Sequence, residues 1–370
     1  MKATIPILSN LTAVRTLKEA ITFSLCLLIF MSCEPHTPPR RSDNLADSIA
    51  AGPKGNLLDQ AKKLQSQQDI AGALLIYDKL LAADPINVAA LGNRAYLLES
   101  AGNLDAALMD YNVLMEVDPS NFAGLIRRAK LLSSMQRDSA ALQDFSLLLT
   151  HRPSDPELLN ARGEVNLRLE NFKAAIADFD AAFRLRRNWE KPILNRASAW
   201  YYLGDAKAAT ADYEFVLQLN PNNSEATNGL GLVRQHLMGD LGKAEEYYQK
   251  ALFQNPNNAG AWFNMAFIEA GRGEKVKAVE DFGQAIRLDT NYVEAHINRG
   301  ILEMQMQRQK EAVLDFQFAA KRRPNDGRMF MLLGWAQCEV SPSMQGCLTL
   351  ARAKELGENG AEELIQKFCN

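Results

Sequence analysis

The sequence predicts an all-α protein in which pairs of helices stack into a solenoid, and three recurring features support this fold class. An alanine followed four residues later by an aromatic residue recurs at a step of 34 residues, with one step of 35. A small residue precedes each alanine by 12 or 13 positions, and most units end on a proline. Self-similarity at this period is typical of stacked helical repeats. The pairs are Ala73 and Tyr77, Ala107 and Tyr111, Ala141 and Phe145, Ala175 and Phe179, Ala209 and Tyr213, Ala244 and Tyr248, Ala278 and Phe282, and Ala312 and Phe316.

The recurring small residue is expected on the first helix of each unit. It lets the second helix approach closely, so that the alanine touches the first helix and the aromatic residue fills the groove beside it. The closing proline ends the second helix, because the residue before a proline avoids helical backbone angles. The small residues are Ala61, Ala95, Ala129, Gly163, Ala197, Gly231, Ala266 and Gly300, and the prolines are Pro85, Pro119, Pro153, Pro221, Pro256 and Pro324.

Each unit is therefore expected to contain two helices joined by a short turn. The one-residue insertion lies between Gly231 and Ala244, and we expect it in the turn around 236–242. The helix pairs are expected at 54–82, 88–116, 122–150, 156–185, 190–218, 224–253, 259–287, 293–321 and 327–356, with a last helix at 361–368.

This spacing of small residue, alanine, aromatic residue and proline resembles the tetratricopeptide repeat (TPR) family over residues 54–326, as eight repeats. Residues 327–370 resemble a degenerate ninth repeat and a C-terminal capping helix, with Gly346 and Leu350 in place of the alanine and the aromatic residue. The family's early tryptophan is mostly missing, and Trp262 is its one clear instance. The resemblance implies a right-handed superhelical solenoid of helix-turn-helix repeats whose concave face holds a protein or peptide partner.

The N-terminus does not follow the repeat. Residues 1–32 combine a basic start with the apolar run 21–31, which is short for a membrane-spanning helix and suits a signal peptide. Cys33 follows this run and resembles the lipidated cysteine of a bacterial lipoprotein; the alternative is an unmodified cysteine in an uncleaved signal anchor. Residues 33–53 are rich in proline and are expected to form a flexible tether. The resemblance implies a cell-envelope protein, lipid-anchored at the outer membrane on its periplasmic or surface face.

Charge and motifs exclude several classes of function. The chain has 41 Lys and Arg against 44 Asp and Glu and no basic block, which argues against a nucleic-acid partner. None of the four histidines has a metal-binding neighbour at usable spacing. Phosphate loops, dinucleotide fingerprints and nucleophile elbows are absent from the sequence. We therefore expect no metal, no cofactor and no enzymatic activity, since the repeats leave no room for a catalytic domain.

Beyond the signal segment and Cys33, the cysteines occur only at the C-terminal end, as Cys338, Cys347 and Cys369. Cys347 lies 11 residues before Glu358 and Cys369 lies 11 after it. If the last helix folds back as an antiparallel hairpin, these two meet, and a disulfide there would hold the terminal cap. The alternative is three buried, reduced thiols.

Arginine and aspartate recur together at a separation of 16 residues. The arginine precedes the small residue of the first helix, and the aspartate precedes the aromatic residue of the second. A row of anion-binding or catalytic sites is one interpretation, but a repeated structural ion pair between the two helices fits better, because a partly buried arginine needs its carboxylate. The pairs are Arg94 and Asp110, Arg128 and Asp144, Arg162 and Asp178, Arg196 and Asp212, and Arg299 and Asp315.

Partner contacts are expected on the first helices, at three before, one after and four after the small residue. In the C-terminal half these positions form an apolar, aromatic stripe, which is either a binding groove or buried core. The predicted groove comprises Tyr96, Lys130, Leu194, Tyr201, Phe263, Phe267, Ile297, Ile301, Met304, Met331 and Trp335.

The sequence thus favours a non-catalytic TPR scaffold lipoprotein that mediates protein–protein interactions in a bacterial envelope assembly or transport complex. The alternative is a regulatory or docking subunit for a cell-wall or polysaccharide enzyme. The fold alone does not choose between the two.

Overall fold

The computed structural model of the chain describes residues 54–341 and 343–369. It divides into two compact units, Met1–Pro85 and Ile86–Asn370. The predicted signal segment 1–32, Cys33 and the rest of the tether 33–53 lie outside the described residues.

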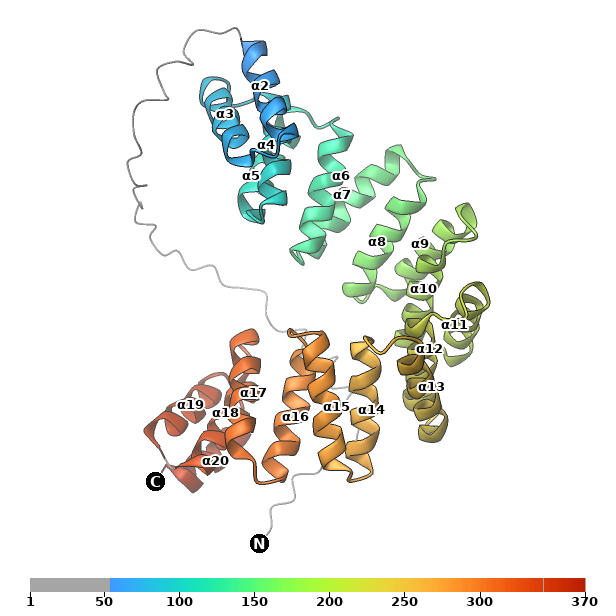
Figure 1. Cartoon of the computed structure of the whole chain (residues 1–370), viewed down its shortest axis with the longest axis vertical. Coiled ribbons are helices and arrows are strands. Elements are labelled where there is room, and N and C mark those ends of the chain that lie inside the picture. The colour runs from blue at the N-terminus through green and yellow to red at the C-terminus, as the bar shows by residue number, and fades with distance from the viewer. Residues whose placement is uncertain (1–53, 342, 370) are drawn as a thin grey trace. The chain divides into compact units, whose positions relative to one another are not determined.

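Every regular element of the described residues is a helix, which confirms the all-α prediction. The first unit holds one helix pair, and in the second unit consecutive helices pack antiparallel, chiefly on their neighbours in the chain, as a solenoid (Figure 1). The helices are α2 (Lys54–Ser66), α3 (Ile70–Ala83), α4 (Val88–Ser100), α5 (Leu104–Val117), α6 (Phe122–Ser134), α7 (Asp138–His151), α8 (Pro156–Arg168), α9 (Phe172–Leu185), α10 (Glu190–Leu203), α11 (Ala206–Leu219), α12 (Ser224–Leu232), η1 (Val233–Leu237), α13 (Leu241–Gln254), α14 (Ala259–Gly271), α15 (Lys275–Leu288), α16 (Val293–Gln305), α17 (Gln309–Arg322), α18 (Gly327–Val340), α19 (Met344–Glu355) and α20 (Gly360–Phe368).

The nine predicted helix pairs begin at the predicted residues and end within one residue of the predicted ends. The described part of the chain contains no helix with both the length and the apolar character needed to cross a membrane.

The small residue of a first helix contacts the aromatic ring of its own second helix. A Cβ added to Gly163 would lie 2.6 Å from Cε1 of Phe179, and one added to Gly300 would lie 2.8 Å from Cε1 of Phe316. Both rings are buried. The aromatic residue therefore packs directly on the small residue as well as in the groove beside it, and this contact holds the two helices of a repeat together.

Turns within the repeats contain one residue in the left-handed region, at the same repeat position each time. A positive φ there ends the first helix and directs the chain back along the second. Glycine holds half of these positions and glutamine or glutamate the others. The residues are Gln68, Gly102, Gln136, Glu170, Gly204, Gly239, Gly273 and Gln307, with φ between 57° and 85°.

Asparagine caps begin several of the first helices. Each side-chain oxygen accepts a hydrogen bond from the backbone N–H three residues later, which satisfies one of the free donors at the helix start. The caps are Asn87, Asn121, Asn223 and Asn258, with bonds of 2.9–3.0 Å.

The one-residue insertion begins earlier than the sequence predicted. It is accommodated by the π-helical turn η1 at the end of α12, where the backbone N–H of Met238 donates to the carbonyl of Val233, 3.2 Å away. A π-turn accommodates one extra residue within a helix. The loop that follows keeps its left-handed glycine, Gly239, so α13 starts in register with the other second helices.

Candidate protein-binding surface

The structure separates the predicted groove residues by exposure. Tyr96 on α4 and Lys130 on α6 are exposed. The half-buried members are Leu194, Tyr201, Phe263, Phe267, Ile301, Met331 and Trp335.

Ile297 and Met304 on α16 belong to the core, so they are not groove residues, contrary to the prediction. Their exposed fractions are 8% and 6%, and they lie in one hydrophobic cluster with Phe316 on α17. Ile301 and Trp335 pack against the same cluster. Successive helices approach closely enough here to close over these side chains, so Ile297 and Met304 are not available to a partner.

Other members of the C-terminal stripe are also used in packing. The ring centroid of Phe263 lies 5.4 Å from that of Phe282 and 4.9 Å from that of Tyr292. A Cβ added to Gly360 would lie 2.8 Å from Sδ of Met331, so the start of α20 rests on this methionine. The apolar character of the stripe therefore reflects helix packing more than an open groove.

Accessible aromatic and charged groups gather instead on the first helices of the earlier repeats. Tyr96 on α4 is 37% exposed, and the guanidinium carbon of Arg127 on α6 lies 4.2 Å from the centroid of its ring. Arg127 also lies 4.0 Å from Glu99, which accepts a hydrogen bond of 3.0 Å from the hydroxyl of Tyr111. The contacts hold the Tyr96 ring beside paired charges while leaving it open to solvent.

A second aromatic group lies at the end of α10. Tyr202 is 59% exposed, and its ring stacks on Phe172 of α9 with a centroid distance of 5.5 Å. Tyr201 contacts Tyr202 edge-on and lies 6.3 Å from His236, and burial raises the pKa of its hydroxyl. Rigid rings with a polar end suit protein recognition, because they bury a large area with little loss of side-chain freedom.

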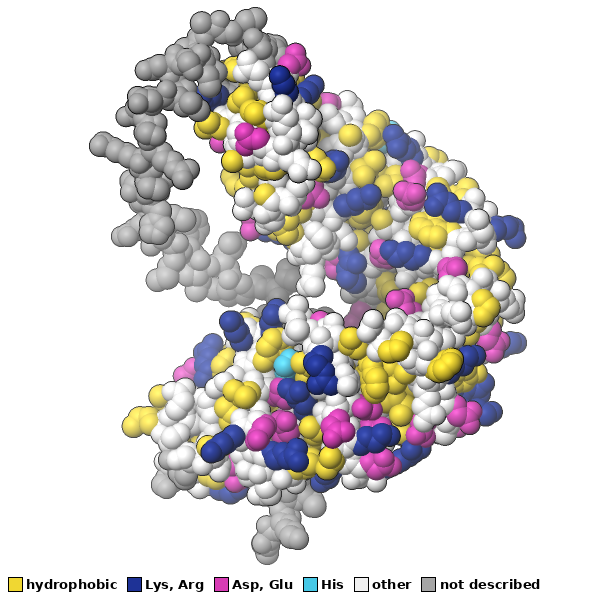
Figure 2. All heavy atoms as spheres, viewed as in Figure 1, with side chains coloured by type: hydrophobic (Ala, Val, Ile, Leu, Met, Phe, Trp, Pro, Cys, Tyr) yellow, Lys and Arg dark blue, Asp and Glu magenta, His cyan; other side chains and the backbone are white. Residues whose placement is uncertain are grey.

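Charges of both signs alternate on the surface. Figure 2 shows Lys and Arg side chains interspersed with Asp and Glu on the face in view. Several form pairs between neighbouring repeats, such as Arg168 with Asp138 at 2.6 Å and Arg137 with Asp105 at 3.0 Å. Exposed pairs of this kind contribute little to stability but shape the field that a partner meets.

All five predicted arginine–aspartate partners lie within ion-pair distance. Nε and Nη2 of each arginine donate to the two carboxylate oxygens of the aspartate, and the aspartates are 2–9% exposed. The Nη2–Oδ1 distances are 2.7 Å for Arg94–Asp110, 2.7 Å for Arg128–Asp144, 2.6 Å for Arg162–Asp178, 2.7 Å for Arg196–Asp212 and 2.8 Å for Arg299–Asp315.

The bidentate geometry leaves these carboxylates little capacity for a ligand. Extra donors occupy some of them further, since Asn166 donates to Asp178 at 3.1 Å and His296 Nδ1 lies 2.6 Å from Asp315. The hydrogen bond to Asp178 raises the pKa of Arg162. Such pairs are best understood as ties between the helices of one repeat.

The repeat with Met265 in place of the arginine lacks the arginine–aspartate pair. Asp281 has no arginine partner at this position, and burial together with the nearby charge of Glu269 raises its pKa to about 6. Glu269 is fully buried, and Lys277 lies 2.7 Å from its Oε1. Glu303 in the next repeat is also buried, and burial with the charge of Asp315 raises its pKa to about 7.

A family model described as tetratricopeptide repeat matches residues 58–116, 126–189, 194–259 and 237–293. These ranges include more than half of the chain and run from α2 to the start of α16. The chain belongs to the tetratricopeptide repeat family. This confirms the family part of the resemblance, and repeats of this kind suggest a role in protein–protein interaction.

Proteins similar to this tetratricopeptide protein are matched over different shares of their length. NADPH oxidase activator 1 of Rattus norvegicus is 29% identical over 154 residues, which cover 36% of this chain and 34% of the rat protein. The match thus spans about a third of that relative. A tetratricopeptide repeat protein from Parabacteroides merdae has a TM-score of 0.59 at 21% identity, covering 67% of this chain and 98% of that chain. The APC/C hetero-tetramer Cut9–Hcn1 has a TM-score of 0.51 at 20% identity, covering 80% of this chain and 57% of that chain.

Sequence reasoning missed the exposed apolar side chains on the second helices of the tetratricopeptide repeats. Phe253 on α13 is 90% exposed. Four others stand two residues before the aromatic position, and an apolar residue at this repeat position was a signal that could have found them. These are Leu75, Met109, Leu314 and Leu348, with exposed fractions of 48%, 69%, 67% and 60%.

At the end of the tetratricopeptide array, a disulfide joins Cys347 on α19 to Cys369 after α20, and their Cα atoms are 5.7 Å apart. Cys338 on α18 is a buried free thiol. The helix α20 folds back on α19, so the bridge closes the hairpin between them.

Proposed function

We propose that this chain is a non-catalytic scaffold that binds protein partners through the first helices of its early repeats. The observation that carries the proposal is the set of accessible aromatic and charged side chains on α4, α6 and α10. We name these four residues the α4–α10 surface: Tyr96, Arg127, Lys130 and Tyr202.

The character of this surface supports a protein ligand. Tyrosine and arginine contribute strongly to protein interfaces, since they combine apolar area with hydrogen bonding. Tyr96 and Arg127 already contact each other in the free protein, so binding a partner costs less side-chain entropy. In a tetratricopeptide array these first helices would line the concave face, which is where we place the contact.

The proposed cellular setting depends on the N-terminal sequence. A basic start, a short apolar run and Cys33 support a lipid anchor in a bacterial cell envelope, at the outer membrane, with residues 33–53 as a tether. A scaffold within an envelope assembly or transport complex combines this anchor with the α4–α10 surface.

The test cross-links the protein to its partners in membranes and compares the amount of partner recovered with matched variants. Tyr96→Ser with Tyr202→Ser is expected to lower recovery of the partner at least tenfold at an unchanged melting temperature. Phe253→Ser, which removes an exposed ring from a second helix, is the control and should recover the partner normally. Loss of the partner with Phe253→Ser and retention with the double variant would move the contact to the second helices. Recovery of a cell-wall enzyme as the main partner would favour a docking subunit over an assembly scaffold.

A further inference from the structure

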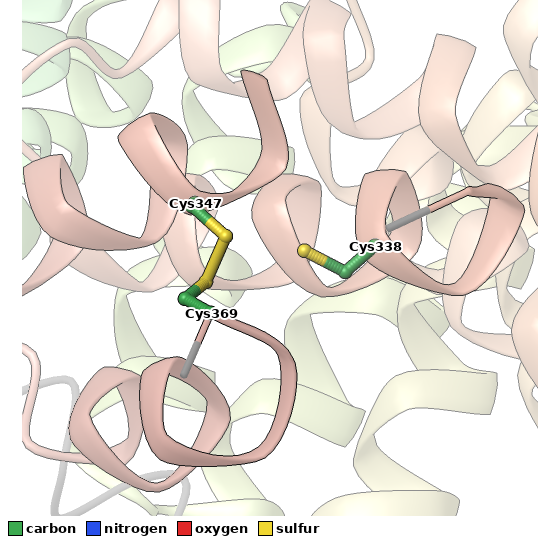
Figure 3. A group of neighbouring side chains, drawn as sticks. All are labelled: Cys338, Cys347 and Cys369. Carbon is green, nitrogen blue, oxygen red and sulfur yellow. A yellow bond between two sulfur atoms is a disulfide. The ribbon is translucent and has the colours of Figure 1, made fainter. Parts of the chain in front are cut away.

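The three cysteines of the described residues meet at one point in the C-terminal cap. Cys338 comes from α18, Cys347 from α19 and Cys369 from the residue after α20. Their three Sγ atoms all lie within 4.8 Å of one another. Figure 3 shows the Cys338 side chain directed towards the bridge between the other two.

The fold makes specific room for the third sulfur. A Cβ added to Gly346 on α19 would lie 2.5 Å from Sγ of Cys338. The eight regular repeats have alanine at the position of Gly346, so this repeat departs from the pattern where the Cys338 sulfur lies. Cys338 is 1% exposed, whereas Cys347 and Cys369 are half-buried and leave the cluster open on one side.

A disulfide that holds the cap needs only two of these cysteines, and the third suits a different chemistry. We propose that the reduced cap binds one monovalent copper ion, Cu(I), through the Sγ atoms of Cys338, Cys347 and Cys369. Cys338, Cys347 and Cys369 are separated in the sequence by 9 and 22 residues. These separations are longer than the cysteine spacings of common metal-binding motifs, so the spacing alone does not indicate the site.

The sulfur geometry fits a single small ion. Metal–sulfur bonds are about 2.3 Å long, so three sulfurs around one ion lie roughly 4 Å apart. The three Sγ atoms reach such separations once the bond between Cys347 and Cys369 is broken, with little movement of Cys338.

The donor set favours Cu(I) over Zn²⁺. Soft thiolates select Cu(I) and Zn²⁺ among the common ions, but structural zinc sites take four protein ligands. Within the described residues, no histidine, aspartate or glutamate joins the three cysteines as a fourth ligand. Three thiolates alone match a three-coordinate Cu(I) ion.

Reduction of the disulfide comes first, and copper binding follows. A small dithiol reductant breaks the Cys347–Cys369 bond, gives up two electrons and two protons, and becomes a cyclic disulfide. Three thiols then bind Cu(I), form three copper–sulfur bonds and release three protons to solvent. The metal replaces the disulfide as the link between α19 and α20 and adds a link to α18.

The test uses the full chain carrying Cys26→Ser and Cys33→Ser, so that only the cap supplies thiols. Reduced, oxygen-free protein is titrated with Cu(I) against a colorimetric Cu(I) chelator, and the bound ion is examined by X-ray absorption. We expect one copper per chain with three sulfur neighbours, and a rise in the melting temperature of the reduced protein.

Two variants separate the site from adventitious binding. Cys338→Ala keeps the disulfide pair and is expected to weaken Cu(I) binding at least tenfold and to leave two sulfur neighbours. Gly346→Ala keeps all three thiols but fills the space of the Cys338 sulfur, so it should also weaken binding. Equal affinity and equal sulfur count in the parent and Cys338→Ala would overturn the proposal, as would failure of the reduced parent to bind copper.

Discussion

Arg162 donates two parallel hydrogen bonds to the carboxylate of Asp178, from Nε at 2.9 Å and from Nη2 at 2.6 Å. Asp178 is 5% exposed and receives a further bond from Asn166. The same pairing recurs in five repeats, where it joins the middle of a first helix to the middle of its second. A buried charge without such a partner is strongly destabilising.

Asp178→Ala is expected to destabilise the fold by about 3 kcal/mol, because it leaves a partly buried arginine without its carboxylate. Asp105→Ala is the control, since Asp105 pairs with Arg137 at the surface and should cost less than about 1 kcal/mol. Denaturant unfolding followed by circular dichroism measures both. Equal stabilities for the two variants would contradict the structural role of the pair.

Glu303→Gln is expected to stabilise the protein above neutral pH. Burial raises the pKa of Glu303 to about 7 from 4.5, so between these values the folded state holds a proton that the unfolded state has released. The contribution of Glu303 to stability therefore falls as pH rises through this window, and the penalty is complete above pH 7. The variant should be more stable at pH 8 by about 1–2 kcal/mol.

Melting temperatures from pH 5 to pH 8 check the Glu303 prediction. Glu246→Gln, an exposed change on α13, is the control and should follow the parent. Parallel curves for the parent and Glu303→Gln would show that this carboxyl is ionised in the fold without cost.

Glu170→Gly is expected to stabilise the fold by about 0.5 kcal/mol, because its φ of 59° is unfavourable for a residue with a Cβ. The converse change, Gly204→Ala, should destabilise by about 1 kcal/mol at a φ of 81°. A Cβ on Gly204 would meet no atom within 4 Å, so the effect reports the backbone alone. Effects of the same sign for both changes would rule out this explanation.

Cys33→Ser is expected to move the protein from the membrane fraction to the soluble fraction, or to leave an uncleaved precursor, because lipidation needs the Cys33 sulfur. Metabolic labelling with a fatty acid and fractionation measure the result. Cys26→Ser, in the apolar run, is the control and should be processed normally. Unchanged lipid labelling of Cys33→Ser would refute the anchor.

The fold could be predicted from the sequence almost completely, because each repeat uses the same short-range contacts. The small residue, alanine and aromatic residue that pack within one repeat recur at a constant step, so the helix pairs could be placed to within one residue. Similar regularity marked the arginine–aspartate partners, since positions 16 apart face each other across one turn.

Tertiary structure alone decided which first-helix residues are accessible. Ile297 and Phe263 stand at the same repeat position, but the packing of neighbouring repeats buries the first and joins the half-buried second to Tyr292. The approach of three helices at the cap likewise placed Cys338 beside the Cys347–Cys369 bridge. Repeat periodicity specifies contacts inside a unit, whereas exposure and the meeting of distant cysteines depend on how each unit packs on the next.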